Sequence, residues 1–238
     1  MLNYDGIIRI CEEAQRNVNQ LATREELDGI NECILFYEDL SGWIQCCDIF
    51  KDNLLIKEAQ EKCIISIVFS AQGLYKEAMI TLRQFFEHLL FGIMLSTSDY
   101  DYRLWKEGSL DMTWARIIDN EEGLFSKKFI RVYGKDINEE RSIELNSIAK
   151  NIYRECSEFV HGNYCKLVSI SSGFEYDKTQ LNFYLDIFNS VKYCVSFALF
   201  IRFRELFDDK HILSRLESIV MDSLGTIPEI QYIYGKEE

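Results

Sequence analysis

Apolar residues recur at intervals of three and four along most of this chain, the spacing of one face of an α-helix. Polar residues fill the positions between them, as in "GIIRICEEAQRNV" at residues 6–18. The segment "TREE" resembles a capping box, because Glu26 follows Thr23 by three positions, and it predicts that a helix begins at Thr23. The pattern predicts helices over 5–20, 23–44, 52–72, 74–96, 111–119, 121–133, 137–161, 179–207 and 211–224.

Two of these segments are long and apolar. The segment "LYKEAMITLRQFFEHLLFGIML" at 74–95 is apolar on almost every face, and "TQLNFYLDIFNSVKYCVSFALFIRFRELF" at 179–207 is a long apolar helix. A helix with apolar residues all round is expected at the centre of a bundle. Gly73 predicts a break or kink before the first of them. Residues 97–110 are expected to form a connection with a short helical turn, and 162–178 a loop with a short strand at "KLVSI".

Composition agrees with an all-α fold. The chain has 238 residues, of which 47% are apolar, and contains only one proline and 12 glycines. So few helix-breaking residues favour long helices, and the apolar content is enough for a substantial core. We expect one compact domain with an N-terminal helical layer over 1–50, a bundle over 51–225 and a polar tail over 226–238.

The charge is strongly acidic overall but uneven. The formal net charge is −13, which on average repels nucleic acid and anionic membrane surfaces. Residues 126–154 are the exception, with seven Lys or Arg against four Asp or Glu, a local net of +3. This basic island either contacts a phosphate-bearing ligand or forms an ordinary solvated helix face.

The cysteines and the ends of the chain bear on location and cofactors. The eight cysteines form no C-x-x-C pair, and the three histidines share no metal-binding spacing, so neither a disulfide framework nor a metal site is expected. No cofactor motif appears. The N-terminus lacks the pattern of a signal peptide, and no run of about 18 apolar residues predicts a membrane span. We therefore expect a cytoplasmic protein with buried thiols and no membrane association.

The segment "RECSEFVH" holds the most distinctive candidate chemistry. Arg154 and His161 are seven residues apart, so on a helix they lie on one face, about 10 Å apart along the axis. Ser157 and Glu158 lie between them on that face and are expected to orient the pair as part of the catalytic site. Histidine can transfer a proton near neutral pH, and arginine offers a planar donor group to phosphate. The alternative is a plain helix end, because Gly162 follows His161 and glycine commonly ends helices.

Two further cations are candidates for substrate binding. Arg83 lies four residues before Glu87 on the apolar helix over 74–96, where it could bind phosphate or form an ion pair that fixes helix register. Lys150 belongs to the basic island and precedes Arg154 by about one helical turn. His88 is expected to be a core histidine rather than a ligand.

Residues 53–208 resemble the HEPN domains, an all-helical family common in bacterial toxins and antiviral systems. "RECSEFVH" matches their R-x4–6-H motif, and "GLYKEAMITLRQFFEHLLF" is similar to their central helix. The resemblance implies a homodimer that acts as a metal-independent endoribonuclease, with Arg154 and His161 as the catalytic pair and RNA or a protein antitoxin as partner.

The chain departs from the family pattern at Glu155, where active members often carry Asn, Asp or His. A carboxylate beside the phosphate site would repel RNA. Many HEPN domains are inactive, which leaves open a non-catalytic dimerisation or interaction module, or an RNA- or nucleotide-binding module.

Overall fold

The computed structural model describes residues 4–46, 54–111, 113–161, 164 and 174–235, and every regular element within them is helical. This confirms the all-α class. The possible strand at 166–170 lies outside the described residues. The longer helices are α1 (Tyr4–Leu21), α2 (Leu27–Cys46), α3 (Leu54–Ala71), α4 (Tyr75–Leu95), α8 (Arg141–Val160), α10 (Lys178–Arg202) and α11 (Lys210–Leu224). The shorter ones are α5 (Asp99–Lys106), α6 (Trp114–Ile117), α7 (Lys127–Tyr133), η2 (Arg204–Asp208) and α12 (Pro228–Gly235).

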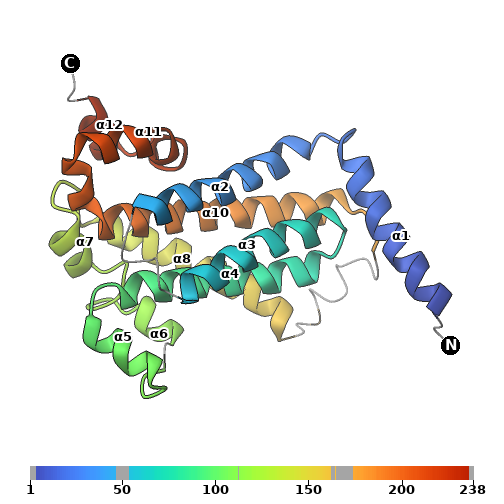
Figure 1. Ribbon diagram of the computed structural model, residues 1–238, viewed down its shortest axis with the longest axis horizontal. Coiled ribbons are helices and arrows are strands. Elements are labelled where there is room, and N and C mark those ends of the chain that lie inside the picture. Colours follow the sequence, from blue (N-terminus) through green and yellow to red (C-terminus); the bar gives the residue numbers. More distant parts are fainter. Residues whose placement is uncertain (1–3, 47–53, 112, 162–163, 165–173, 236–238) are drawn as a thin grey trace.

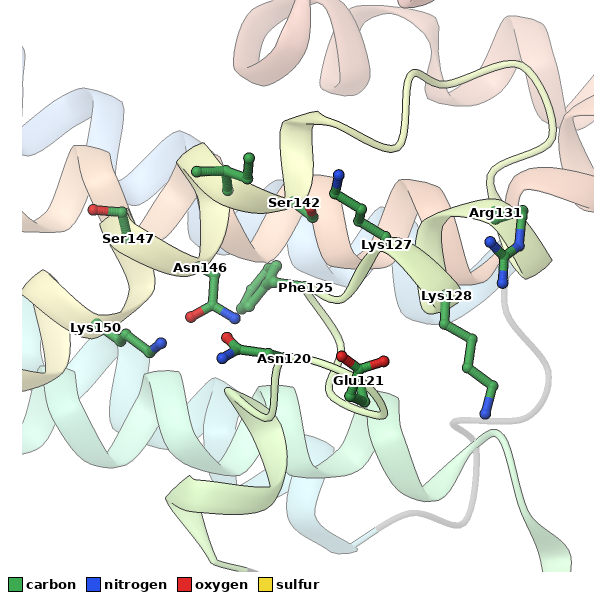
Figure 2. A pocket seen from close by; sticks show the side chains of 11 residues that line it. Asn120, Glu121, Phe125, Lys127, Lys128, Arg131, Ser142, Asn146, Ser147 and Lys150 are labelled. Carbon is green, nitrogen blue, oxygen red and sulfur yellow. The ribbon is translucent and has the colours of Figure 1, made fainter.

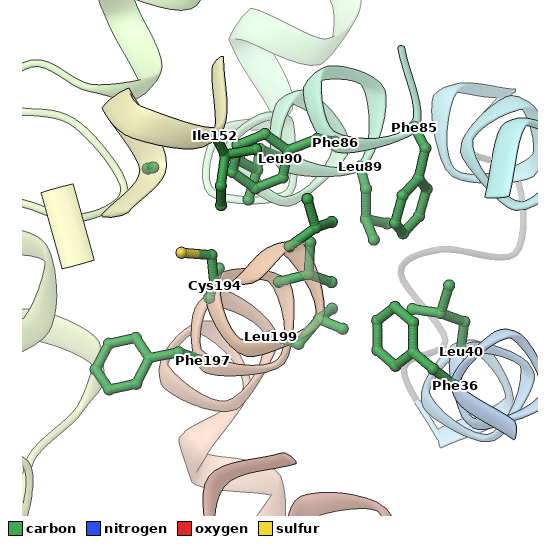
Figure 3. Close-up of a cluster of buried hydrophobic side chains, with 14 of the residues drawn as sticks. Phe36, Leu40, Phe85, Phe86, Leu89, Leu90, Ile152, Cys194, Phe197 and Leu199 are labelled. Carbon is green, nitrogen blue, oxygen red and sulfur yellow. The ribbon is translucent and has the colours of Figure 1, made fainter. Parts of the chain in front are cut away.

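Helices α4 and α10 lie at the centre of the bundle, and for α4 the all-round apolar sequence predicts this position. Helix α4 packs against α3, α8 and α10, while α10 also contacts α2, α11 and α7. Figure 3 shows side chains from α2, α4, α8 and α10 meeting in one cluster, with Phe36, Phe85 and Phe86 among the fully buried residues. Because α2 supplies Phe36, Leu40 and Trp43 to this core, it is an integral part of the bundle.

The turn at Gly73 separates α3 from α4 and helps to hold α1. Gly73 has a φ of +85°, a left-handed conformation that favours glycine, so the predicted break is present. The buried Asn17 of α1 donates through Nδ2 to the carbonyl oxygens of Gln72 (3.0 Å) and Phe174 (2.5 Å). This side chain therefore fixes α1, which crosses one end of the bundle (Figure 1), to the α3–α4 turn.

The capping box predicted at Thr23 is wrong. The Thr23 hydroxyl donates to the carbonyl of Gln20 (2.9 Å), which closes the end of α1, and α2 begins only at Leu27. Glu26 is instead buried, where its carboxylate accepts from the Tyr176 hydroxyl (3.0 Å) and lies 3.4 Å from the Lys178 ammonium. A tertiary contact with the segment before α10 thus takes the side chain that the local pattern assigned to the cap.

The segment between α5 and α8 is less helical than predicted. Helix α6 spans only four residues and α7 begins at Lys127 rather than near residue 121. Asp119 accepts from the backbone N–H groups of Glu121 (2.9 Å) and Glu122 (2.8 Å) and so forms a turn, and Ser126 then caps α7. Aspartate and serine side chains that bind nearby backbone N–H groups favour turns and caps over continuous helix.

The structure also differs from the predicted polar tail over 226–238. Residues 228–235 form α12, whose Ile230 and Ile233 are buried. Glu229 of this helix accepts from Arg141 Nε (3.1 Å) and from a terminal guanidinium nitrogen (2.6 Å). Helix α12 is thereby joined to the start of α8, and two isoleucines spaced by three residues were the signal for it in the sequence.

The apolar helices and the cysteines bear on location and chemistry. Helices α4 and α10 are long and apolar enough to cross a membrane, but 72% of each candidate window is buried inside the bundle, as expected of core helices. Among the described residues, the six cysteines are free and no group of three or more potential metal ligands occurs. Cys47 and Cys165 lie outside the described residues.

Candidate functional site at the surface of helix α8

Arg154 and His161 both lie at the solvent-exposed surface of α8. The side chain of Arg154 is 68% exposed and donates to Asn151 Oδ1 (2.7 Å) and Glu155 Oε1 (3.2 Å). His161 is the C-terminal cap of α8, where its backbone N–H donates to the carbonyl of Ser157 (3.0 Å) and its side chain is exposed. Both side chains are therefore open to a large ligand, and the histidine also marks the helix end.

Ser157 and Glu158 have different surroundings from the pair they were predicted to orient. The Ser157 hydroxyl donates to the Tyr153 carbonyl (2.5 Å), a bond within α8 that uses its only proton. Glu158 is half-buried. Ser157 is thus held by the helix backbone, and its part in catalysis stays a prediction.

Glu155 forms an ion pair with Arg154 at 3.2 Å. Glu155, the residue that departs from the HEPN pattern, thus partly neutralises Arg154, the side chain predicted to bind phosphate. Because the arginine is mostly exposed, the pair contributes only about 0–1 kcal/mol. A phosphate group approaching Arg154 would compete with a weak partner.

Arg83 lies against α8 on the side that carries Tyr153. One guanidinium nitrogen donates to the Tyr153 hydroxyl (2.6 Å) and to Glu87 (3.3 Å), and the side chain is 16% exposed. The guanidinium also lies 4.2 Å from the centre of the Tyr153 ring, which stacks on Trp114 at 4.4 Å. These contacts tie α4, α6 and α8 together, so the structure gives Arg83 an interhelical role, and substrate binding by Arg83 stays a prediction.

Lys150 lies in an open cavity of about 720 Å³ between α8, α7 and the segment before α7. Figure 2 shows the cavity with the side chains of Asn120, Asn146 and Lys150 close to one another on one side and Lys127, Lys128 and Arg131 on the other. The cavity is lined by Asn120, Glu121, Phe125, Lys127, Lys128, Arg131, Ser142, Ile143, Asn146, Ser147 and Lys150. Four of the seven cations of the basic island therefore surround one hollow.

The cavity cations differ in their ion pairs. Lys127 pairs with Glu140, Lys128 with Glu122, and Arg131 with Glu139, each between exposed side chains. No carboxylate within the described part of the chain lies within 4.0 Å of the Lys150 ammonium. Lys150 is thus the cavity cation most available to an added anion.

The cavity and the Arg154–His161 pair share the exposed face of α8. Lys150 precedes Arg154 by four residues, about 6 Å along the helix axis. The basic island indicated this surface from the sequence. The two asparagines gave no comparable signal, because Asn120 reaches the cavity only through the fold of the α6–α7 segment.

None of the family models, the curated proteins or the solved structures that were compared with this chain matches it. The resemblance to HEPN domains therefore rests on the R-x6-H motif and the helix patterns quoted above.

Proposed function

We propose that this protein is an HEPN-like, metal-independent endoribonuclease of the toxin or antiphage type. The observation that supports the proposal most directly is the position of Arg154 and His161, which are both exposed on one helix beside the only basic island of the chain. A buried or fully paired arginine and histidine would have favoured a purely structural helix end.

In this proposal His161 takes the proton from a ribose 2′-hydroxyl group. The 2′-oxygen then forms a bond to the adjacent phosphorus, and the bond from phosphorus to the 5′-oxygen of the next nucleotide breaks. The products are a 2′,3′-cyclic phosphate and a 5′-hydroxyl group that takes up a proton, supplied by water or by His161 of a second copy. Arg154 donates to the equatorial phosphate oxygens and stabilises their added negative charge.

The test is cleavage of a mixed-sequence RNA by the purified protein in EDTA. We expect wild-type protein to release cyclic phosphate ends and His161→Ala to reduce the rate by at least 100-fold, the usual contribution of a general base. His211→Ala is the matched control, because His211 is also exposed but lies on α11.

Equal cleavage by wild-type protein and folded His161→Ala would overturn the proposal, as would a lack of cleavage across varied RNA sequences and protein concentrations. Concentration should be varied because the resemblance implies a homodimer in which two α8 helices face each other. The mass of the particle in solution checks that arrangement directly.

A binding protein without turnover is the second candidate. Arg154 already donates to Asn151 and Glu155, and Ser157 donates to the helix backbone. These two candidate catalytic side chains are therefore not arranged around a reacting atom. The basic cavity next to the pair would then be the functional feature, either for RNA or for a nucleotide. RNA that binds without being cleaved in the experiment above would favour this candidate.

A further inference from the structure

The cavity between α7 and α8 contains neither Arg154 nor His161, and its residues form a binding site of their own. We propose that it binds a nucleotide unit, with a phosphate held by the cavity cations and a base whose amino group donates to the side-chain oxygen of Asn146. This inference deepens the second candidate function by naming the contacts of the ligand, and it holds whether or not the protein cleaves RNA.

The cations supply the phosphate site. Lys127, Lys128, Arg131 and Lys150 line the hollow, against the single carboxylate of Glu121. Three of the four are paired with Glu140, Glu122 and Glu139 outside the lining. Those pairs are exposed and therefore weak, so a phosphate can replace a carboxylate at small cost. Lys150 has no carboxylate within 4.0 Å among the described residues and is available without any exchange.

Asn146 supplies the second, independent feature. The residue is 7% exposed, and Nδ2 donates to the carbonyl of Ile118 at 3.1 Å. That bond fixes the orientation of the amide, because a flipped amide would place two oxygens against each other. The other end, Oδ1, is buried without a donor in the described part of the chain. A buried acceptor without a partner is costly, so the site favours a ligand that brings an N–H group.

A ligand reaches the buried Oδ1 of Asn146 by displacing exposed side chains at the cavity. Figure 2 shows the side chains of Asn120 and Lys150 flanking Asn146 at the cavity, and both are exposed and can turn aside. Ser147 adds an exposed hydroxyl to the lining. Amide groups pair well with the amino edges of bases, whereas a simple anion would leave Asn146 unsatisfied.

The size of the cavity and the distribution of charge fit a nucleotide unit. A cavity of about 720 Å³ is within the usual range for small-molecule sites, roughly 300–1,000 Å³. Outside residues 126–154 the chain has 19 basic and 35 acidic residues, a net of −16. The island is thus the part of the surface where a phosphate meets least repulsion, and a nucleotide unit in the cavity places its charge there.

The same chemistry could come from a free mononucleotide or from one residue of a single-stranded RNA. Titration calorimetry on the full chain, with CMP, UMP and inorganic phosphate, tests the first source. A short 2′-O-methyl oligocytidine tests the second, because it cannot be cleaved through a 2′-hydroxyl group. CMP and UMP differ at the group proposed to contact Asn146, because cytosine carries an amino donor at the position where uracil has a carbonyl acceptor.

We expect CMP or the oligocytidine to bind, and UMP and phosphate to bind at least tenfold more weakly. Lys150→Glu should weaken binding by tenfold or more, because it removes a charged phosphate contact. Lys57→Glu makes the same charge change at an exposed site outside the cavity and should alter affinity by less than twofold. Asn146→Leu should remove the preference for cytosine.

Two results would overturn the inference. One is the absence of binding by CMP and by the oligonucleotide at millimolar concentration. The other is equal binding of phosphate, UMP and CMP that Lys150→Glu does not weaken. Lys150 is exposed, so this variant tests the site even if Asn146→Leu fails to fold. His161→Ala should keep wild-type affinity for CMP, which separates failure of this inference from failure of the cleavage proposal.

Discussion

At the scale of single residues, several polar side chains have roles that depend on distant parts of the chain. Glu26, Arg83 and Asn146 each contact a residue at least 28 positions away. The sequence could single out Arg154 and His161, because their spacing on one helix is a local property. It could not single out Asn146, because the Ile118 carbonyl that orients this amide comes from another element.

His88 of α4 predicts a pH dependence of stability. Burial lowers the pKa of His88, although Glu58 and Glu87 act in the opposite direction and Lys62 adds to the lowering. The folded protein therefore resists a proton that the unfolded chain accepts near pH 6.5. The free energy of unfolding should fall as pH drops through that value and level off below the folded pKa.

Urea unfolding between pH 5 and pH 8 checks this prediction. Replacement by glutamine, His88→Gln, should flatten the decrease in stability on the acidic side. His211→Gln changes an exposed histidine on α11 and should leave the decrease in place. The same pH profile for wild type and His88→Gln would show that another group controls it.

At the scale of elements, the sequence predicted the long helices well and the short ones poorly. Helices α3, α4, α8 and α10 have many apolar positions in register, so their amphipathic or fully apolar character is unambiguous. Helices α6 and α7 have four and seven residues, too few for a periodic pattern, and are delimited by side-chain contacts such as Asp119 and Ser126. Their placement, which shapes the cavity, depends on tertiary structure.

Helix α12 should depend on the ion pair between Glu229 and Arg141. The two side chains are only 22% and 21% exposed, and the carboxylate accepts two guanidinium hydrogen bonds. We expect Glu229→Gln to lower the free energy of unfolding by about 1.5–3 kcal/mol, the range for hydrogen bonds to charged groups.

Urea unfolding measures the loss of stability, and the backbone amides of 228–235 should exchange their hydrogens faster in the variant. Glu205→Gln is the matched control, because Glu205 pairs with Lys135 in a pair exposed by 76% and 58%. That variant should change stability by less than about 0.5 kcal/mol. Equal losses in the two variants would mean that α12 is held by Ile230 and Ile233 rather than by the ion pair.

At the scale of the whole molecule, one acidic bundle carries a localised basic surface. The chain folds its only basic island around a cavity and exposes Arg154 and His161 on the same helix. The sequence already connected the island and the pair, because the island ends at Arg154. In the structure α8 contributes Lys150 to the cavity and Arg154 to the pair, and His161 caps the same helix.

The buried cysteines allow the opening of the bundle to be measured by their reaction with a thiol reagent. Cys33, Cys63, Cys156 and Cys194 lie on α2, α3, α8 and α10, one thiol in each of four core helices. Burial raises the pKa of Cys33 to about 12 and that of Cys63 and Cys194 further, so these thiols do not react while the helices stay packed.

Labelling with a thiol-specific reagent, followed by peptide mass spectrometry, would give the reaction rate of each cysteine and so identify which helix opens. We expect the exposed Cys11 to react within seconds to minutes and the four core thiols to react together, at the rate of global unfolding. Early labelling of one core cysteine would instead identify a helix that separates on its own. Ligand bound beside α8 should then slow the labelling of Cys156.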